Sequence, residues 1–283
     1  MRDVYYELID YKEVQPIGFW VILIGLIVLF VLFAYVFKNI QNGKAISKSL
    51  MALKLAIIIA LISSIANFYN SIYRRSEDSS ISNSEYIFGI DISHHQGRID
   101  WREMRTSHHP IEFVFIKATE GTTFKDPKFK YNWKNAKKYH YIRGAYHFYS
   151  PNSNSTKQFE NYKSNVKIKE GDFIPILDIE QEGRLGSKNL RKGVLNWLKL
   201  AEKEYAVKPM IYTNLNFYRK ILKGYVDGYP LWIAAYEGKR RVKNEKWTFH
   251  QFTEKVKIKG VDEYVDGSDF RGTIEDLKKM CKK

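Results

Sequence analysis

The sequence predicts an α/β protein whose main part is a small or irregular barrel, preceded by one or two apolar helices that span a membrane. Short β-rich runs alternate with helical stretches from Tyr86 onward, and repeated strand–helix units imply a parallel sheet. About eight such strands fall within ~190 residues, which suits a compact barrel. After residue 214 the strands follow one another with little room for helices.

Composition narrows the class of protein. The chain has 283 residues with 45% hydrophobic and 15% aromatic content, which indicates a folded core. Cys281 is the only cysteine, so intrachain disulfides and cysteine metal sites are excluded. The net charge of +15 would attract nucleic acid, anionic lipid or acidic wall polymer. The lysines are scattered without a compact basic helix, so we interpret them as solvated faces and expect no nucleic-acid partner.

The first element is an uncharged apolar run from Ile17 to Phe37, long enough to span a bilayer. It is long for the core of a signal peptide, and no small-residue cleavage site follows it. A second run between Lys54 and Arg74 is weaker because serines and asparagines interrupt it. The number of basic residues in the loop between the two runs nearly equals the number in the outer flanks. The positive-inside rule therefore leaves the orientation open.

A Ser-rich stretch from Arg74 to Tyr86 has the composition of a flexible linker. The expected organisation is an N-terminal tail at 1–16, a membrane anchor at 17–73 with helices at about 17–37 and 51–73, a linker at 74–86, a barrel at 87–277 and a basic tail at 278–283.

Strands and helices are expected in alternation through the barrel. Strands are predicted at 86–93, 111–118, 141–150, 173–180, 208–214, 230–236, 247–252 and 260–265. Helices are predicted at 100–107, 126–140, 155–167 and 187–205. In the last of these, an apolar stripe repeats at helical spacing, formed by Leu190, Val194, Trp197, Leu198, Ala201 and Tyr205.

Polar residues gather where the predicted strands end, which is where barrels of this kind carry their chemistry. They are Asp91, Ser93, Lys117, Glu120, His147, Asp178 and Glu180. Strand alternation places Asp178 and Glu180 on one face. Neighbouring carboxylates resist ionising together, so such a pair can supply one acid and one base at the same pH. From the residues alone, the pair is either catalytic or simply the polar end of a strand.

Eight blocks together resemble glycoside hydrolase family 25, the muramidases that include Chalaropsis-type lysozymes. They are GIDISHHQGRIDW (89–101), FIKATEG (115–121), RGAYHFYSP (143–151), ILDIE, IYTN, LWIAAY, HQF and VDGSDFRG (265–272). The resemblance covers roughly residues 87–273 and neither apolar segment. Ser268 replaces the usual Asn two positions after Asp266, and Asp262 offers a rival alignment.

The resemblance implies an irregular TIM-like (β/α)5(β)3 barrel that hydrolyses the β-1,4 bond between N-acetylmuramic acid and N-acetylglucosamine in peptidoglycan. Its acidic cluster corresponds to Asp91, Asp178, Glu180 and Asp266. Glu180 would donate the proton to the leaving oxygen. Adjacent acids on one strand suit attack by the substrate's own N-acetyl oxygen, with Asp178 orienting the amide, better than a covalent nucleophile on the far side of the sugar.

The remaining expectations concern binding and location. Substrate contacts are expected from Lys117, Glu120, Tyr146, His147, Tyr212, Trp232, Tyr236 and Gln251, with ordinary barrel packing as the alternative for each. The pairs His94–His95 and His108–His109 lack a metal-ligand spacing, so no metal and no cofactor are expected. We expect a monomeric catalytic domain, held at the cytoplasmic membrane by a multi-pass anchor and facing the cell wall or periplasm.

Two alternatives stay open at this point. One is a catalytically weak wall-glycan-binding membrane protein, and the other is a hydrolase of another N-acetylated glycan.

Overall fold

The computed structural model describes residues 86–107, 110–236 and 239–283, together with the isolated positions 27, 31, 35, 59 and 63. The chain divides into two compact units, Met1–Ser76 and Glu77–Lys283. The predicted apolar spans at 17–37 and 51–73 lie outside the described residues except for those five positions. Among the described residues, no helix combines the length and the apolar character that crossing a bilayer requires.

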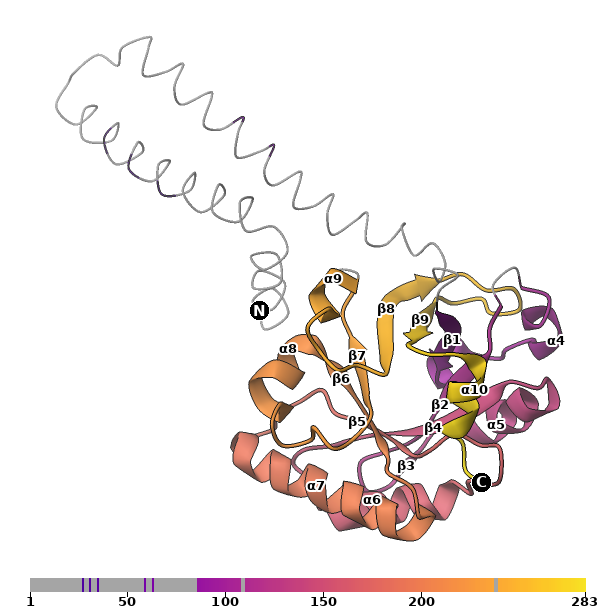
Figure 1. Cartoon of the computed structure of the whole chain (residues 1–283), viewed down its shortest axis with the longest axis horizontal. Coiled ribbons are helices and arrows are strands. Elements are labelled where there is room, and N and C mark those ends of the chain that lie inside the picture. Colours follow the sequence, from indigo (N-terminus) through magenta and orange to yellow (C-terminus); the bar gives the residue numbers. More distant parts are fainter. Residues whose placement is uncertain are drawn as a thin grey trace. The chain divides into compact units, whose positions relative to one another are not determined.

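The second unit is a closed barrel of eight strands, so the predicted α/β barrel is confirmed (Figure 1). The barrel strands, in sheet order, are β1 (Ile87–Ile92), β2 (Phe113–Glu120), β4 (Ile142–Phe148), β5 (Ile176–Asp178), β6 (Met210–Asn214), β7 (Leu231–Ala234), β8 (Phe249–Val256) and β9 (Val265–Phe270). Neighbours pair in parallel from β1 to β8, whereas β9 runs antiparallel to both β8 and β1 and closes the barrel. The short β3 (Phe124–Lys125) folds back on β2.

Helical segments follow each of the first five barrel strands in the chain. They are α4 (Trp101–Met104), α5 (Phe129–Lys138), α6 (Ser155–Asn165), α7 (Gly186–Tyr205) and the pair α8 (Leu215–Phe217) with η2 (Tyr218–Leu222). Beyond them, only the four-residue α9 (Lys239–Val242) separates β7 from β8, and α10 (Ile274–Lys279) ends the described helices. The early strands are therefore covered by helices and the late strands follow one another directly.

Two sequence predictions at the C-terminal end are wrong. Residues 261–264 form a loop, not a strand, because Gly260 adopts a positive φ of 77° and turns the chain before β9 begins at Val265. The expected tail at 278–283 belongs to the barrel unit. Helix α10 continues to Lys279, Cys281 pairs with Phe173, and the backbone N–H of Lys282 donates to the carbonyl of Asp172.

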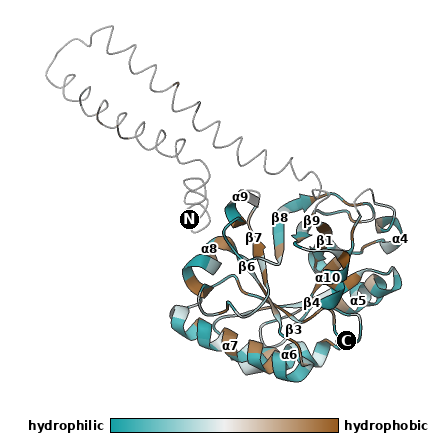
Figure 2. Cartoon of the chain, viewed as in Figure 1, coloured by the Kyte–Doolittle hydropathy of each residue, from teal (hydrophilic) through white to brown (hydrophobic). Residues whose placement is uncertain are grey.

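Aromatic rings fill the barrel lumen beneath the upper rim. The ring of Phe115 lies 4.9 Å from Phe173, 5.0 Å from Trp232 and 5.2 Å from Phe249. The strands make room for this layer through Gly89, where a Cβ would come within 2.4 Å of the Phe113 ring. Figure 2 shows α6 and α7 with both hydrophobic and hydrophilic segments, as expected for helices with one face on the sheet. The packed lumen thus provides a rigid floor.

A buried ion pair ties β4 to the segment before β5. Arg143 donates from Nε and Nη2 to the Asp172 carboxylate at 2.7 and 3.0 Å, and both side chains are less than 10% exposed. Asp172→Ala would leave a buried guanidinium without its counter-ion. We expect a loss of about 3–5 kcal/mol in the free energy of unfolding, measured by urea denaturation. The control Glu204→Ala removes an exposed pair with Lys163 and should cost under about 1 kcal/mol. Equal costs for the two variants would contradict the expected role of burial.

Candidate active site

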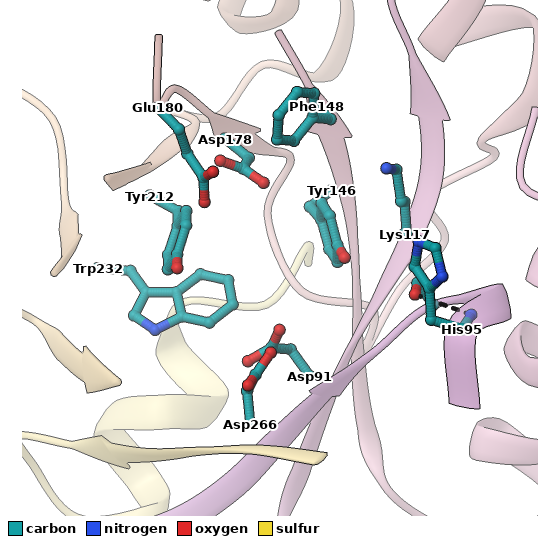
Figure 3. Close-up of a pocket in the computed structure, with 11 residues that line it drawn as sticks. Asp91, His95, Lys117, Tyr146, Phe148, Asp178, Glu180, Tyr212, Trp232 and Asp266 are labelled. Atoms are coloured by element: carbon teal, nitrogen blue, oxygen red, sulfur yellow. Dashed lines mark hydrogen bonds between the residues drawn. The ribbon is translucent and has the colours of Figure 1, made fainter. Parts of the chain in front are cut away.

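A cavity of about 170 Å³ opens at the carboxyl ends of the parallel strands (Figure 3). It lies above the aromatic layer of the lumen. Its lining residues are Asp91, Ser93, His95, Lys117, Tyr146, Phe148, Asp178, Glu180, Tyr212, Trp232 and Asp266. Four carboxyl groups from three strand regions therefore meet in one small space, on the end of the barrel where the sequence predicted chemistry.

Asp178 and Glu180 reach the cavity from the end of β5. Ile179 between them is fully buried and its N–H donates to the carbonyl of Tyr212 at 2.9 Å, so the chain stays extended and the two acids share a side. Figure 3 shows their carboxyl groups close together. Oδ1 of Asp178 is buried and has no hydrogen-bond partner among the described residues. Because Asp178 lines the cavity, its carboxyl group has an acceptor to spare for a ligand N–H or O–H.

Burial and mutual repulsion oppose the ionisation of both carboxyl groups of this pair at once, so the pair holds one proton and one charge. Burial, and then the charge of Glu180, raise the pKa of Asp178 well above its usual range. Burial also raises the pKa of Glu180, against the lowering effect of the nearby Lys117 ammonium. A carboxyl group whose pKa is raised keeps its proton to higher pH, which is the property required of a general acid.

Asp91 and Asp266 form the second carboxyl pair, facing the first across the cavity (Figure 3). They come from neighbouring strands, with Asp91 of β1 directly opposite Asp266 of β9, and their side chains share a hydrogen bond. Burial and the charge of Asp266 raise the pKa of Asp91 well above its usual range. Burial raises the pKa of Asp266 to about 6. The pair therefore shares a proton over part of the acid pH range.

The raised pKa of Asp266 predicts a stability change with pH. Its folded-state pKa of about 6 exceeds the unfolded value of about 3.9. The native state thus binds this proton more tightly, and the stabilisation is lost as pH rises from about 4 through 6. The wild type should therefore lose about 2–3 kcal/mol of stability between pH 3.5 and pH 7 that Asp266→Asn does not lose. The difference in the free energy of unfolding, variant minus wild type, should rise by that amount over this range. Urea denaturation across that range measures it, with the exposed Asp262→Asn as the matched control. A constant difference between Asp266→Asn and wild type would contradict the expectation.

Gln251 of β8 connects this carboxyl pair to two tyrosines. Its Oε1 accepts from the hydroxyl groups of Tyr212 at 2.8 Å and Tyr236 at 3.0 Å. Its Nε2 donates to Oδ2 of Asp91 at 2.8 Å. Because both tyrosines donate to the amide oxygen, the amide nitrogen must face Asp91. The glutamine is 2% exposed and does not line the cavity, so it positions Asp91 and does not reach a ligand there.

Lys117 is the cation of the cavity wall. Its Nζ donates to Oε2 of Glu120 at 2.7 Å and lies 4.8 Å from the centre of the Phe148 ring. Glu120 itself does not line the cavity, and its side chain is 42% exposed.

On the opposite wall, Trp232 donates from Nε1 to Oγ of Ser268 at 3.0 Å. Ser268, where the resemblance leads one to expect Asn, thus holds a cavity-lining ring in place.

The structure corrects the expectation for His147. It is fully buried outside the lumen, where Nδ1 lies 2.7 Å from Thr119 Oγ1 and the ring stacks on Trp197 of α7. Alternation along β4 explains this, since Tyr146 points into the cavity and the next residue must point toward the helices. Burial lowers the pKa of His147 to about 4, which suits a neutral core residue. Tyr236, which is 38% exposed, also lies outside the lining set.

Between the two rival aspartates, Asp266 lines the cavity and Asp262 is exposed in the preceding loop.

The sequence reasoning missed His95 as a cavity residue, because a lone pair of histidines was considered only as a metal site. The spacing of Ser93 and Gln96 was a usable signal, because it is that of a capping box. In the structure these two residues form the box and fix the turn η1 (His94–Gln96), which carries His95. No group of three or more metal-ligating side chains is found among the described residues.

The sequence profile of glycosyl hydrolases family 25 matches residues 90–261 of the chain, which include Asp91, Asp178 and Glu180. The chain belongs to glycosyl hydrolase family 25. The protein YegX of Escherichia coli K12 is 36% identical over 260 residues, which cover 85% of this chain and 95% of YegX. Lysozyme M1 of Streptomyces globisporus is 31% identical over 207 residues, 68% of this chain and 70% of its own length. A family 25 glycosyl hydrolase structure from Bacillus anthracis superposes with a TM-score of 0.65 at 31% identity, covering 71% of this chain and 96% of that one.

Membership makes this protein a glycoside hydrolase of the lysozyme (muramidase) type. The four carboxyl groups of the cavity agree with that chemistry, which needs a proton donor and an anion near the sugar. The alternative of a wall-binding protein with little catalytic power is not favoured.

Proposed function

We propose that this family 25 enzyme hydrolyses peptidoglycan at the β-1,4 bond between N-acetylmuramic acid and N-acetylglucosamine, with Glu180 as proton donor. The observation that carries the proposal is the meeting of Asp178 and Glu180, both with raised pKa values, in a cavity that also holds Asp91 and Asp266.

Glu180 acts first as the acid. Its protonated carboxyl group gives its proton to the glycosidic oxygen as the bond to C1 breaks, and the leaving sugar departs as an alcohol. Lys117 opposes the effect of burial on the pKa of Glu180, so that the group can still release its proton. The resulting carboxylate is then available to take a proton from the incoming water.

Asp178 supports the sugar that becomes positive. Two acids at the end of one strand are poorly placed to act from opposite faces of a sugar. The 2-acetamido oxygen of the substrate attacks C1 and forms an oxazolinium ion. The amide N–H donates to the unpartnered Oδ1 of Asp178, whose negative charge stabilises this ion. Water, deprotonated by Glu180, then opens the ring and restores both groups.

Asp91 and Asp266 hold further negative charge opposite the reacting pair. Gln251 keeps Asp91 in one orientation, through the amide geometry that Tyr212 and Tyr236 impose. Tyr146 lines the cavity and offers its ring to the sugar, whereas Trp232 is 2% exposed and packs against Phe115 and Tyr212.

Product analysis tests the proposed bond specificity. The full-length chain is incubated with purified peptidoglycan, the new reducing ends are reduced, and the products are identified by mass spectrometry. Muramitol at the new ends is the expected result. Glucosaminitol, or release of products from chitin but not from peptidoglycan, would overturn the proposal in favour of another glycosidase specificity.

The membrane anchor is part of this proposal. The uncharged apolar run from Ile17 to Phe37 is long enough to cross a bilayer, which supports this part of the proposal. The similarity to YegX covers 85% of this chain, more than the unit Glu77–Lys283 occupies, so YegX shares part of the N-terminal region. The spans at 17–37 and 51–73 hold the barrel on the wall side of the cytoplasmic membrane, with the loop around Lys44 inside.

Cell fractionation tests the anchor. The full-length chain should sediment with membranes, resist washing with high salt, and dissolve in detergent. A chain that begins at Ser80 should remain in the soluble fraction. External protease should remove the barrel from spheroplasts. Full-length protein in the soluble fraction, or a barrel protected from protease, would contradict this arrangement.

A further inference from the structure

Next to the catalytic cavity lies a buried acid that the proposed mechanism does not use. Asp126 is 5% exposed, and its Oδ2 accepts from both the backbone N–H and Nδ1 of His94, at 2.9 and 2.8 Å. Because the carboxylate accepts, the hydrogen of the His94 ring is assigned to Nδ1. Asp126 therefore fixes both the position and the tautomer of a histidine that does not itself line the cavity.

The ring of His94 in turn supports His95. The two ring centres are 4.1 Å apart, and the N–H of His95 donates to Oγ of Ser93 at 3.2 Å. His95 lines the cavity, is exposed, and makes no side-chain hydrogen bond among the described residues. Asp126 thus positions the His94 ring, and the His94 ring contacts one side of the His95 ring. The His95 imidazole is exposed to the cavity and to the substrate.

The surroundings of His95 indicate which part of the substrate it meets. Figure 3 shows His95 and Lys117 on the side of the cavity away from Tyr212 and Trp232. They are the two basic side chains among the lining residues, whereas four of the others are carboxylic acids. An electron-rich or anionic substituent of the substrate would be repelled by those acids and attracted to this side.

N-acetylmuramic acid carries such a substituent, because it differs from N-acetylglucosamine by a 3-O-lactyl group that ends in a carboxylate or in the amide of a stem peptide. We propose that His95, held by the Asp126–His94 pair, binds the lactyl-derived group of the muramyl residue and thereby determines specificity for muramyl glycans. This inference rests on the proposed function and assigns its substrate selectivity to a named side chain.

Binding measurements test the proposal separately from catalysis. In the full-length Glu180→Gln background, calorimetry compares a GlcNAc–MurNAc glycan fragment with a chito-oligosaccharide of equal length that lacks the lactyl group. His95→Ala should weaken binding of the muramyl ligand about 5–20-fold, the size of one hydrogen bond to a polar group. Binding of the lactyl-free ligand should change less than about twofold. His95→Gln, which keeps a donor and an acceptor, should restore most of the affinity.

The supporting role of His94 is tested by a double-mutant cycle. His94→Ala should weaken muramyl binding when His95 is present and should have no further effect in the His95→Ala chain. Unchanged muramyl affinity in His95→Ala would overturn the proposal, and an equal loss for both ligands would overturn the lactyl assignment. An effect of His94→Ala that is independent of His95 would overturn the proposed support through the ring contact. If Glu180→Gln retained hydrolysis, the proposed catalytic role would fail while these binding differences would still be measured.

Discussion

Glu180→Gln should lower the rate of peptidoglycan hydrolysis by about 10²–10⁴-fold while leaving glycan binding intact. Glutamine keeps the shape of the side chain but has no proton to give to the glycosidic oxygen. Burial raises the pKa of Glu180 at this position. A glutamine there has no titratable proton, so the variant lacks the acid that the leaving oxygen requires. Turnover is measured by release of reducing ends, and binding by calorimetry.

The matched control is Glu182→Gln, two residues further along the same loop. Glu182 does not line the cavity, so its exchange should leave hydrolysis unchanged. If Glu180→Gln kept near-normal turnover, the acids at the end of β5 would be only the polar end of a strand. If both variants lost activity together with their fold, shown by a lower melting temperature, the comparison would indicate a structural role for this loop.

Asp178→Asn should slow hydrolysis by about 10²-fold or more, the cost of losing one pre-positioned electrostatic group. An amide cannot stabilise the positive oxazolinium ion as a carboxylate does. The same mechanism predicts that a substrate whose 2-amino group is not acetylated resists cleavage by the wild-type enzyme. Normal cleavage of that substrate would contradict the participation of the acetamido oxygen and favour a covalent nucleophile.

The pH profile gives a second, independent readout for Asp178→Asn. The charge of Glu180 raises the pKa of Asp178, and because the interaction between two charges is reciprocal, a charged Asp178 raises the pKa of Glu180. The basic limb of the rate profile belongs to the acid that must be protonated. Removing the charge at position 178 should therefore move the basic limb to lower pH. A basic limb that stays in place, or moves to higher pH, would show that the limb reports another group.

Local patterns in the sequence determined a large part of the fold. Alternation within FIPILDIE predicted that Asp178 and Glu180 share a side, and both line the cavity. The stripe from Leu190 to Tyr205 predicted the buried face of α7, and these residues are buried. Such predictions succeed because period and sidedness within one element are set by its own residues. The failures also have local causes, as at Gly260, where a turn interrupts a run that alternates like a strand.

The composition of the site was harder to predict because it depends on contacts between distant segments. Asp91 and Asp266 belong together only because β9 reverses direction and closes the barrel against β1. Asp262 had the same residue type and a similar context in the sequence, yet it lies exposed in the loop before β9. The closing block VDGSDFRG favoured Asp266 and left Asp262 as a rival, and the register of the closing strand decides between them.

The sequence by itself determined the order of strands and helices, the acids at strand ends, the family resemblance and the prediction of an anchor. Only the tertiary structure decided that His147 packs outside the lumen, that Gln251 positions Asp91 without lining the cavity, and that Asp126 and His94 support His95. The physical reason is the difference between local and non-local interactions. Periodicity encodes which way a side chain points within its own element, whereas the partner that it meets depends on barrel closure and on the aromatic packing of the lumen.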